Sequence, residues 1–509
     1  MVDQGKQDPQ LTVAKILGAD CELSNAIMGR HPQPPRIAAA TLLSHIDGFP
    51  RRRKRGTAIE RDRRFLPQTA ASFYEDSDHV ELNLPEHTRA MDHANMLHGA
   101  GFRPVQQAMQ AAQRELPADT RMNVVANCSD GHTSWGSHLN IMVTRNCFDD
   151  IVARKPHQAG FLATHFVTSV GYTGQGMVGA SNGRANCTFQ LSQRADWFET
   201  FASHQTMFDR GVINLRDESH ANRQLARMHI IFFDMVLSPI ANILKAGTTQ
   251  LVLAMIEAGW VDPTLCLDNA VAAASEISRD MSMRCRLQTV VRGRLMTAVE
   301  IQRAIAELAG EFVASGCAEG IVPDAQQIVD LWIETLSLLQ RGEIEALAKR
   351  CDAWLKFLSL DRQRARRNLS WPSDEMHIAD SLFASLDPQT SLFFQAAEKG
   401  FVQQMPDTAT VERFATEPPD DTRAYFRAHV LRRFGKNVDS MDWSRITFQV
   451  PTARHWASFA DIPMLDPRRL TRAETEVLLQ EATTLEELVE AANALTQTDQ
   501  SLVPVGYQN

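Results

Sequence analysis

Apolar residues in the first 210 positions fall into short runs separated by loops that contain Gly, Asn, Asp or Pro. Short runs of this kind, bounded by turn-forming residues, predict β-strands. The predicted strands cover residues 12–23, 71–84, 122–126, 140–144 and 187–192. One helix is predicted between them, over residues 85–115. Its first residue would be Pro85, because proline at that position loses no helical hydrogen bond.

From residue 221 the apolar residues recur at the helical period instead. The predicted helices cover residues 221–244, 248–258, 297–315, 326–339 and 343–358. Strands first and helices later predict an α+β fold rather than a doubly wound parallel sheet. Prolines punctuate residues 400–421, which predicts a large domain over 1–405 and a small C-terminal domain over 406–509. The small domain would end in an acidic helix over residues 472–495.

Composition narrows the class of protein. The chain has 509 residues, of which 44% are hydrophobic and 22% charged, so it can bury a large core. Its formal net charge of −9 argues against a general nucleic-acid binder. The first ten residues are polar, and the most apolar stretch, 230–244, contains Asp234 and Pro239, so no membrane segment is expected. Eight scattered cysteines without a CxxC pair favour free thiols in a reducing compartment. We therefore expect a soluble cytoplasmic protein.

A basic run begins with Arg51 and extends to Arg64. Clustered like charges repel one another, so the run predicts a solvated loop at the rim of a site rather than a nucleic-acid element or a nuclear signal. A loop that meets an acidic partner or phosphates remains an open alternative.

Two acidic segments could bind a metal ion or perform acid–base chemistry. Asp20 and Glu22 would point to one face of a strand, because side chains in a strand alternate between its faces. Magnesium prefers such hard oxygen ligands, although this short segment alone favours an ordinary polar strand face. The second segment gathers six ionisable residues around a predicted turn. They are Glu75, Asp76, Asp78, His79, Glu81 and Glu86.

Other candidates are single residues. His138 precedes an apolar strand and, taken alone, is better explained as a core histidine than as a ligand. The glycine-rich stretch 171–179 matches neither the Walker sequence nor the dinucleotide fingerprint. Arg194 and Arg216 carry planar guanidinium groups suited to phosphate oxygens. Surface ion pairs with Asp196 or Asp217 are the alternative for these two arginines.

Taken in order, these segments resemble one family, the Pup ligases and Pup deamidases/depupylases. Pup is the prokaryotic ubiquitin-like protein that tags substrates for a bacterial proteasome. The resemblance is most specific over residues 189–220 and extends from about residue 16 to beyond Trp443. It implies a glutamine synthetase-like fold, in which helices back a curved antiparallel sheet that cradles the site. It also implies ATP and Mg²⁺ as cofactors, and as substrate a Pup-like protein modifier, a peptide or a small molecule.

The resemblance also implies roles for individual residues. Asp76 matches the catalytic aspartate, and Trp443 matches a tryptophan that contacts ATP. Arg194 and Arg216 would hold phosphates. The implied metal ligands are Asp20, Glu22, Tyr74, Glu81 and His138. We expect Asp20, Glu22, Glu81 and His138 to converge on one divalent cation at the concave face of the sheet.

Several positions depart from the family pattern. Asp20 replaces a longer Glu, and Leu139 replaces the Glu of a His-Glu-Asn strand. Ser72 replaces an ATP-contacting Arg, Ala126 a Lys, and Leu84 an ATP-contacting Thr. Because each charge-assisted hydrogen bond contributes roughly 1.5–3 kcal/mol, the loss of two cations predicts weaker nucleotide binding.

The spacing of Asp76 and His79 resembles the deamidase/depupylase branch more than the ligase branch. We therefore expect ATP- and Mg²⁺-dependent amide-bond chemistry at a Gln or Glu side chain, in a direction that the sequence leaves open. The alternatives are a carboxylate–amine ligase for a small molecule or peptide, and a pseudoenzyme that only binds a partner.

Overall fold

An eight-stranded antiparallel sheet forms the centre of the structure. The structure is a computed structural model, and it describes residues 12–30, 32–50, 61–217, 223–404, 408–450 and 458–497. The strand order is β12-β7-β1-β5-β4-β3-β2, and β6 pairs with the far half of β1. The strands are β1 (Leu17–Gly29), β2 (Phe49–Pro50), β3 (Arg61–Phe65), β4 (Ser72–Asp76), β5 (His79–His87), β6 (Thr120–Val125), β7 (Ser137–Thr144) and β12 (Leu225–Ile230).

The central strand β1 separates the two faces of this sheet. Leu17, Ala19, Cys21 and Leu23 are buried in the main hydrophobic core, whereas the residues between them face the other way and are only partly buried. The strict alternation follows from the two-residue period of a strand. It confirms that Asp20 and Glu22 share one face.

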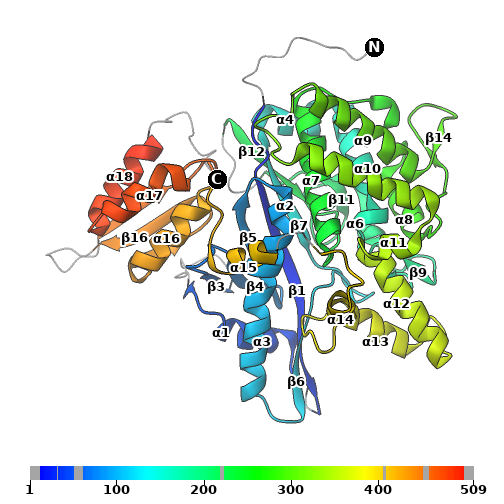
Figure 1. Ribbon diagram of the computed structural model, residues 1–509, viewed down its shortest axis with the longest axis horizontal. Coiled ribbons are helices and arrows are strands. Elements are labelled where there is room, and N and C mark those ends of the chain that lie inside the picture. The colour runs from blue at the N-terminus through cyan, green and yellow to red at the C-terminus, as the bar shows by residue number, and fades with distance from the viewer. Residues whose placement is uncertain are drawn as a thin grey trace.

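Helices cover the apolar face of the sheet (Figure 1). The helices that pack against β5 include α1 (Pro35–Ser44), α2 (Ala90–Met96) and the π-helix η2 (Leu97–Phe102), and α3 (Arg103–Glu115) continues from η2. A larger helical layer, cyan to yellow in Figure 1, comprises α5 (Pro156–Thr168), α7 (Pro239–Glu257), α8 (Ala270–Arg279), α9 (Ala298–Ala314), α10 (Ala325–Arg341), α11 (Ile344–Ala348), α12 (Asp352–Arg367) and α13 (Asp374–Phe383). By length and composition α7 could cross a membrane, but it is wholly buried inside the protein and is therefore a core helix.

A smaller unit, orange to red in Figure 1, has its own hydrophobic cluster. It contains α16 (Ala424–Phe434), β15 (Val438–Met441), β16 (Arg445–Val450), β17 (Ser458–Pro463), α17 (Arg472–Glu481) and α18 (Leu485–Gln497). Phe65 of β3 belongs to this cluster, so the unit packs on the β3 side of the sheet. Phe414 of α15 (Thr408–Thr416) packs instead in the main core. The division at residue 405 stays a prediction, and the packing of Phe414 favours a division after α15.

Several predicted elements differ from the structure. The strand predicted over 71–84 is the β4–β5 hairpin, and the helix predicted over 343–358 is divided into α11 and α12. Residues 225–230 form a strand and α7 begins only at Pro239, so the helix predicted over 221–244 is wrong. A dense apolar run has the same appearance in a buried strand and in a buried helix. Pro85 lies inside β5, beyond the last residue paired with β4 and beside a register shift against β1, where no N–H is required. The predicted C-terminal helix is interrupted between α17 and α18.

The basic run is described only in part. Residues 51–60 lie outside the described residues, so their predicted loop is not addressed. The last part of the run is not a loop, because Arg61–Phe65 forms β3 and pairs with β4.

A buried ion cluster joins the small unit to the sheet. Glu86 of β5 contacts Arg423 at 2.6 Å and Arg427 at 2.5 Å, and all three side chains are buried. Burial alone would raise the pKa of the Glu86 carboxyl, but the two guanidinium groups hold it well below its usual value of 4.5. A carboxyl with a lowered pKa in the folded state stabilises the fold above its unfolded pKa and loses that contribution as the pH falls.

We expect Glu86→Gln to lower the free energy of unfolding by about 3–5 kcal/mol at neutral pH, because it leaves two buried guanidinium groups without a counter-charge. The loss should shrink as the pH is lowered below 4.5, because the carboxyl then gains a proton in the unfolded state while it keeps its charge in the folded state. Urea unfolding at several pH values measures this. Glu476→Gln, which breaks an exposed pair with Arg472, should leave stability unchanged, and equal loss in both variants would contradict the prediction.

Candidate active site on the polar face of the sheet

Two rows of polar side chains cross the face of the sheet opposite the hydrophobic core, which we call the polar face. The first row is Tyr74, Glu81 and Glu22, which lie opposite one another on β4, β5 and β1. The second row is Ser72, Asn83, Asp20 and His138 on β4, β5, β1 and β7. Because directly opposed side chains on one face are only about 5 Å apart at Cβ, each row is a contiguous group.

The first row offers hard oxygen ligands. The Tyr74 hydroxyl donates to Glu81 Oε1 at 2.6 Å, and Asn83 Nδ2 donates to the same oxygen at 3.2 Å. The backbone N–H of Gly136 donates to Glu22 Oε1 at 3.0 Å. Burial and the neighbouring carboxylates of Asp20 and Glu22 raise the pKa of Glu81 well above its usual value. A divalent cation would relieve this repulsion, and the oxygen-only donor set fits Mg²⁺.

Beside the second row lies His229, a histidine that the sequence did not indicate as a candidate. Ligand atoms of Asp20, His138 and His229 all lie within 4.8 Å of one another. His138 Nδ1 lies 2.6 Å from Asp20 Oδ2, and Asn140 Nδ2 donates to Asp20 Oδ1. Burial alone would raise the pKa of Asp20, but His138, His229 and Arg227 together lower it well below its usual range. A carboxylate with two imidazoles suits Mn²⁺ or Zn²⁺ as well as Mg²⁺.

His229 also has a defined orientation. Its Nδ1 lies 2.8 Å from Asn140 Oδ1, which in addition accepts a hydrogen bond from Arg227 Nη1 at 2.9 Å. Burial, Arg227 and His138 lower the pKa of His229 well below its usual value, which favours the neutral imidazole that metal ions require. The alternation of Arg227 and His229 within a strand was the available signal, and the mistaken helix over this segment concealed it.

The four residues expected to share one cation thus lie on one face, but in two rows. Glu22 and Glu81 belong to the first, and Asp20 and His138 to the second, together with His229. The geometry favours two cation positions over one, and metal binding at either remains a prediction.

Asp76 ends β4 next to the first row. It lies on the same strand face as Ser72 and Tyr74, and its charge contributes to the raised pKa of Glu81. A two-residue hairpin turn follows, in which Ser77 and Asp78 have φ of 50° and 71°. The carboxylate of Asp76 is partly exposed and accepts a hydrogen bond from Ser77 Oγ at 3.0 Å. Such a group can receive a proton or attack a substrate beside bound cations.

The two arginines expected to bind phosphates have different surroundings. Arg194 is only 1% exposed, and its guanidinium donates to the backbone oxygens of Trp135 and Ile231. These contacts favour a structural role. Arg216 is partly exposed, donates to the His204 backbone oxygen at 2.9 Å and lies close enough to His229 to lower its pKa. Phosphate binding by either arginine stays a prediction.

Trp443 lies at the β3 side of the polar face. Its ring meets Phe65 edge-on, with 6.0 Å between the ring centroids. The Arg427 guanidinium lies over the Trp443 ring, 4.6 Å from its centroid. Arg427, which pairs with Glu86 in the buried cluster, therefore also positions the Trp443 ring. The tryptophan is partly exposed, so a planar ligand can reach it.

Three of the departures from the family pattern do not face the candidate site. Leu84, Ala126 and Leu139 are at most 2% exposed, and all three side chains belong to the main hydrophobic core. Leu139 alternates with His138 and so points away from the polar face. Of these positions and Ser72, only Ser72 lies on the polar face, where it pairs with Asn83.

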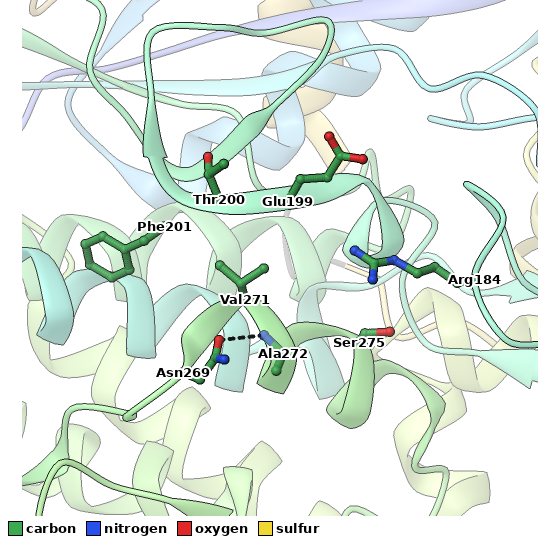
Figure 2. A pocket seen from close by; sticks show the side chains of 8 residues that line it. All are labelled: Arg184, Glu199, Thr200, Phe201, Asn269, Val271, Ala272 and Ser275. Carbon is green, nitrogen blue, oxygen red and sulfur yellow. Dashed lines mark hydrogen bonds between the residues drawn. The ribbon is translucent and has the colours of Figure 1, made fainter.

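A separate cleft of about 380 Å³ lies between β10 (Phe198–Ser203) and the start of α8 (Figure 2). Figure 2 shows Glu199 and Thr200 above the cleft and Val271, Ala272 and Ser275 below it. None of the residues that line it belongs to the two rows, so it is not part of the candidate active site.

Comparison with solved structures defines the class of fold. A crystal structure of the complex between the prokaryotic ubiquitin-like protein Pup and its ligase PafA matches 97% of this chain and 96% of that chain, with a TM-score of 0.77 and 23% identity. A structure of the Pup ligase PafA in complex with ADP matches 82% of this chain and 89% of that chain, with a TM-score of 0.67 and 23% identity. The chain therefore has the glutamine synthetase-like fold.

Sequence comparison defines the family. The family model described as Pup-ligase protein matches residues 30–447. A depupylase from Acidothermus cellulolyticus is 34% identical over 83% of this chain and 82% of its own length. The chain belongs to the Pup-ligase family, which confirms the resemblance found in the sequence.

Proposed function

We propose that this chain is an ATP- and Mg²⁺-dependent enzyme that acts on an amide bond at a Gln or Glu side chain of a Pup-like protein. One observation supports this above all others. Asp76, a partly exposed carboxylate, ends its strand beside the first row, in which Tyr74, Glu81 and Glu22 offer oxygen ligands for a cation. The depupylase at 34% identity and the ligase that binds Pup support the substrate class.

The hydrolytic direction is favoured. Asp76 would activate water, or attack the amide carbonyl itself to form an acyl intermediate that water then hydrolyses; in both cases the amine or ammonia leaves. Divalent cations bound at the two rows would neutralise negative charge on the phosphates and on the reacting carbonyl oxygen. In the reverse direction Asp76 would take a proton from an incoming amine. The depupylase relative supports the first direction.

Nucleotide binding belongs to the same proposal, and the structural neighbour that contains ADP supports it. Trp443 offers an aromatic face for the base, and Arg216 lies near the second row for the phosphates. A pseudoenzyme is disfavoured, because the replaced residues Leu84, Ala126 and Leu139 pack in the hydrophobic core and do not face the site. We infer a cytoplasmic location and a Pup-like partner, with no nucleic-acid or membrane partner.

The test uses the full chain with Mg²⁺ and ATP. A Pup-like peptide that ends in Gln should release ammonia, and one attached through its terminal side chain to an amine should be freed from it. Incubation of the Glu form with a free amine measures the ligase direction in parallel. Ligation without hydrolysis would reverse the proposed direction, and no turnover of any substrate would contradict the proposal.

A further inference from the structure

We propose that Arg63 of β3 binds the phosphate chain of the nucleotide and thereby supplies the positive charge that Ser72 lacks. This inference rests on the proposed function, since it assigns a further residue to the same nucleotide site. It also replaces the expectation that the loss of an arginine at position 72 weakens nucleotide binding.

The guanidinium of Arg63 occupies the space beside Ser72. Its Nη1 donates to Ser72 Oγ at 3.0 Å, and its Cζ lies 3.8 Å from the centroid of the Tyr74 ring. The side chain is largely buried, with 5% of the residue exposed. Because Ser72 is small, it leaves room for a guanidinium that reaches over from the neighbouring strand.

The strand register places Arg63 on the polar face. Phe65 pairs with Ser72, and Arg63 precedes Phe65 by two residues, so the two side chains project to the same side. The 5.7 Å separation between Arg63 Cζ and the Phe65 ring agrees with this. Arg64 lies between them, pairs with the core residue Phe73 and faces the other side.

Arg63 therefore lies between the two ends of the proposed nucleotide site. On one side Phe65 contacts Trp443, the candidate for the base. On the other side Tyr74 donates to Glu81, the candidate cation ligand. A nucleotide that stacks on Trp443 and reaches the cations with its phosphates must pass over Arg63. A guanidinium is suited to that contact, because its planar donors match phosphate oxygens.

The same geometry accounts for an arginine on β3 beside a serine on β4. Of Ser72, Leu84, Ala126 and Leu139, only Ser72 faces the site, and a cation from another strand lies beside it. A guanidinium from β3 keeps a positive group over Tyr74 although position 72 of β4 carries none. The positive charge of the site is thus relocated rather than lost.

Calorimetry of the full chain with Mg²⁺ and ADP or ATP tests this. Arg63→Ala should weaken nucleotide binding by about 10–100-fold, because one charge-assisted contact is lost. Arg63→Gln, which keeps much of the packing over Tyr74 and a donor for Ser72, should lose nearly as much. Arg64→Ala is the matched control and should bind as the unaltered chain does.

A double variant that moves the arginine from β3 to β4 gives a stronger test. In the double variant Arg63→Ala/Ser72→Arg, the new arginine on β4 should restore affinity to within about threefold of the unaltered chain. Unchanged affinity in both Arg63→Ala and Arg63→Gln would overturn this inference alone. No nucleotide binding by the unaltered, folded chain would overturn the proposed function as well.

Discussion

Replacement of Asp76 by asparagine is expected to reduce amide-bond turnover at least about a hundredfold. A general base contributes roughly 10²–10⁴-fold, and a nucleophile can contribute more. Asparagine has almost the same shape as aspartate but is neither a base nor a carboxylate nucleophile at neutral pH. Because Asp76 ends its strand with a partly exposed side chain, the fold and nucleotide affinity should change little. Steady-state turnover, calorimetry and thermal unfolding of the variant measure the three quantities.

The adjacent carboxylates provide matched controls. Asp78 is exposed in the hairpin turn with φ of 71°, a conformation that asparagine adopts readily, so Asp78→Asn should keep activity and stability. Glu75 projects to the opposite face, 3.8 Å from Arg36, and cannot substitute for Asp76. Turnover close to that of the unaltered chain in Asp76→Asn would contradict both the residue assignment and the proposed chemistry.

Loss of the divalent cation is expected to have an effect of similar size. A chelator should abolish turnover, and Mg²⁺ in excess should restore it. Glu81→Gln should lower turnover at least about a hundredfold at a fixed Mg²⁺ concentration, because a neutral amide ligates Mg²⁺ more weakly than a carboxylate. Part of the loss should be recovered by raising the Mg²⁺ concentration. Activity measured over a Mg²⁺ titration shows both effects.

Glutamine can replace Glu81 without loss of the neighbouring hydrogen bond. Glutamine keeps an oxygen that accepts the hydrogen bond from the Tyr74 hydroxyl, so the row should retain its packing. The same substitution at the exposed Glu199, in the cleft of Figure 2, should leave the Mg²⁺ dependence unchanged. Full turnover in the presence of a chelator would show that the polar face needs no cation.

The local pattern of the sequence predicted much of the site. Side-chain alternation placed Asp20 and Glu22 on one face, and the structure confirms this. The ionisable residues around a turn form the β4–β5 hairpin, which brings Tyr74 opposite Glu81. These features depend on neighbours in the sequence and on one tight turn, so they can be inferred without knowledge of the whole fold.

Contacts between distant strands could not be predicted in the same way. His229 joins Asp20 only because β12 pairs with β7, and its strand had been assigned to a helix. Arg63 was hidden in a basic run that indicated a solvated loop, whereas β3 pairs with β4 and buries its side chain. Charge clustering alone does not show which member of a run a neighbouring strand will cover.

The departures from the family pattern show a second limit. Sequence comparison marks a replaced residue but not the face toward which it points. Leu139 and His138 are neighbours in the chain, yet Leu139 packs in the core and His138 contacts Asp20. The replacements at Leu84 and Ala126 had indicated impaired nucleotide contacts, and their burial in the core removes that argument.

Mass spectrometry of a Pup-like protein joined through its terminal side chain to an amine measures the proposed chemistry most directly. The purified chain, supplied with Mg²⁺ and ATP, should release the modifier with a terminal Glu. Asp76→Asn should leave the conjugate intact although it binds nucleotide as tightly as the unaltered chain. An intact conjugate with both proteins, in samples that are folded and bind nucleotide, would contradict the account, as would equal release by the two.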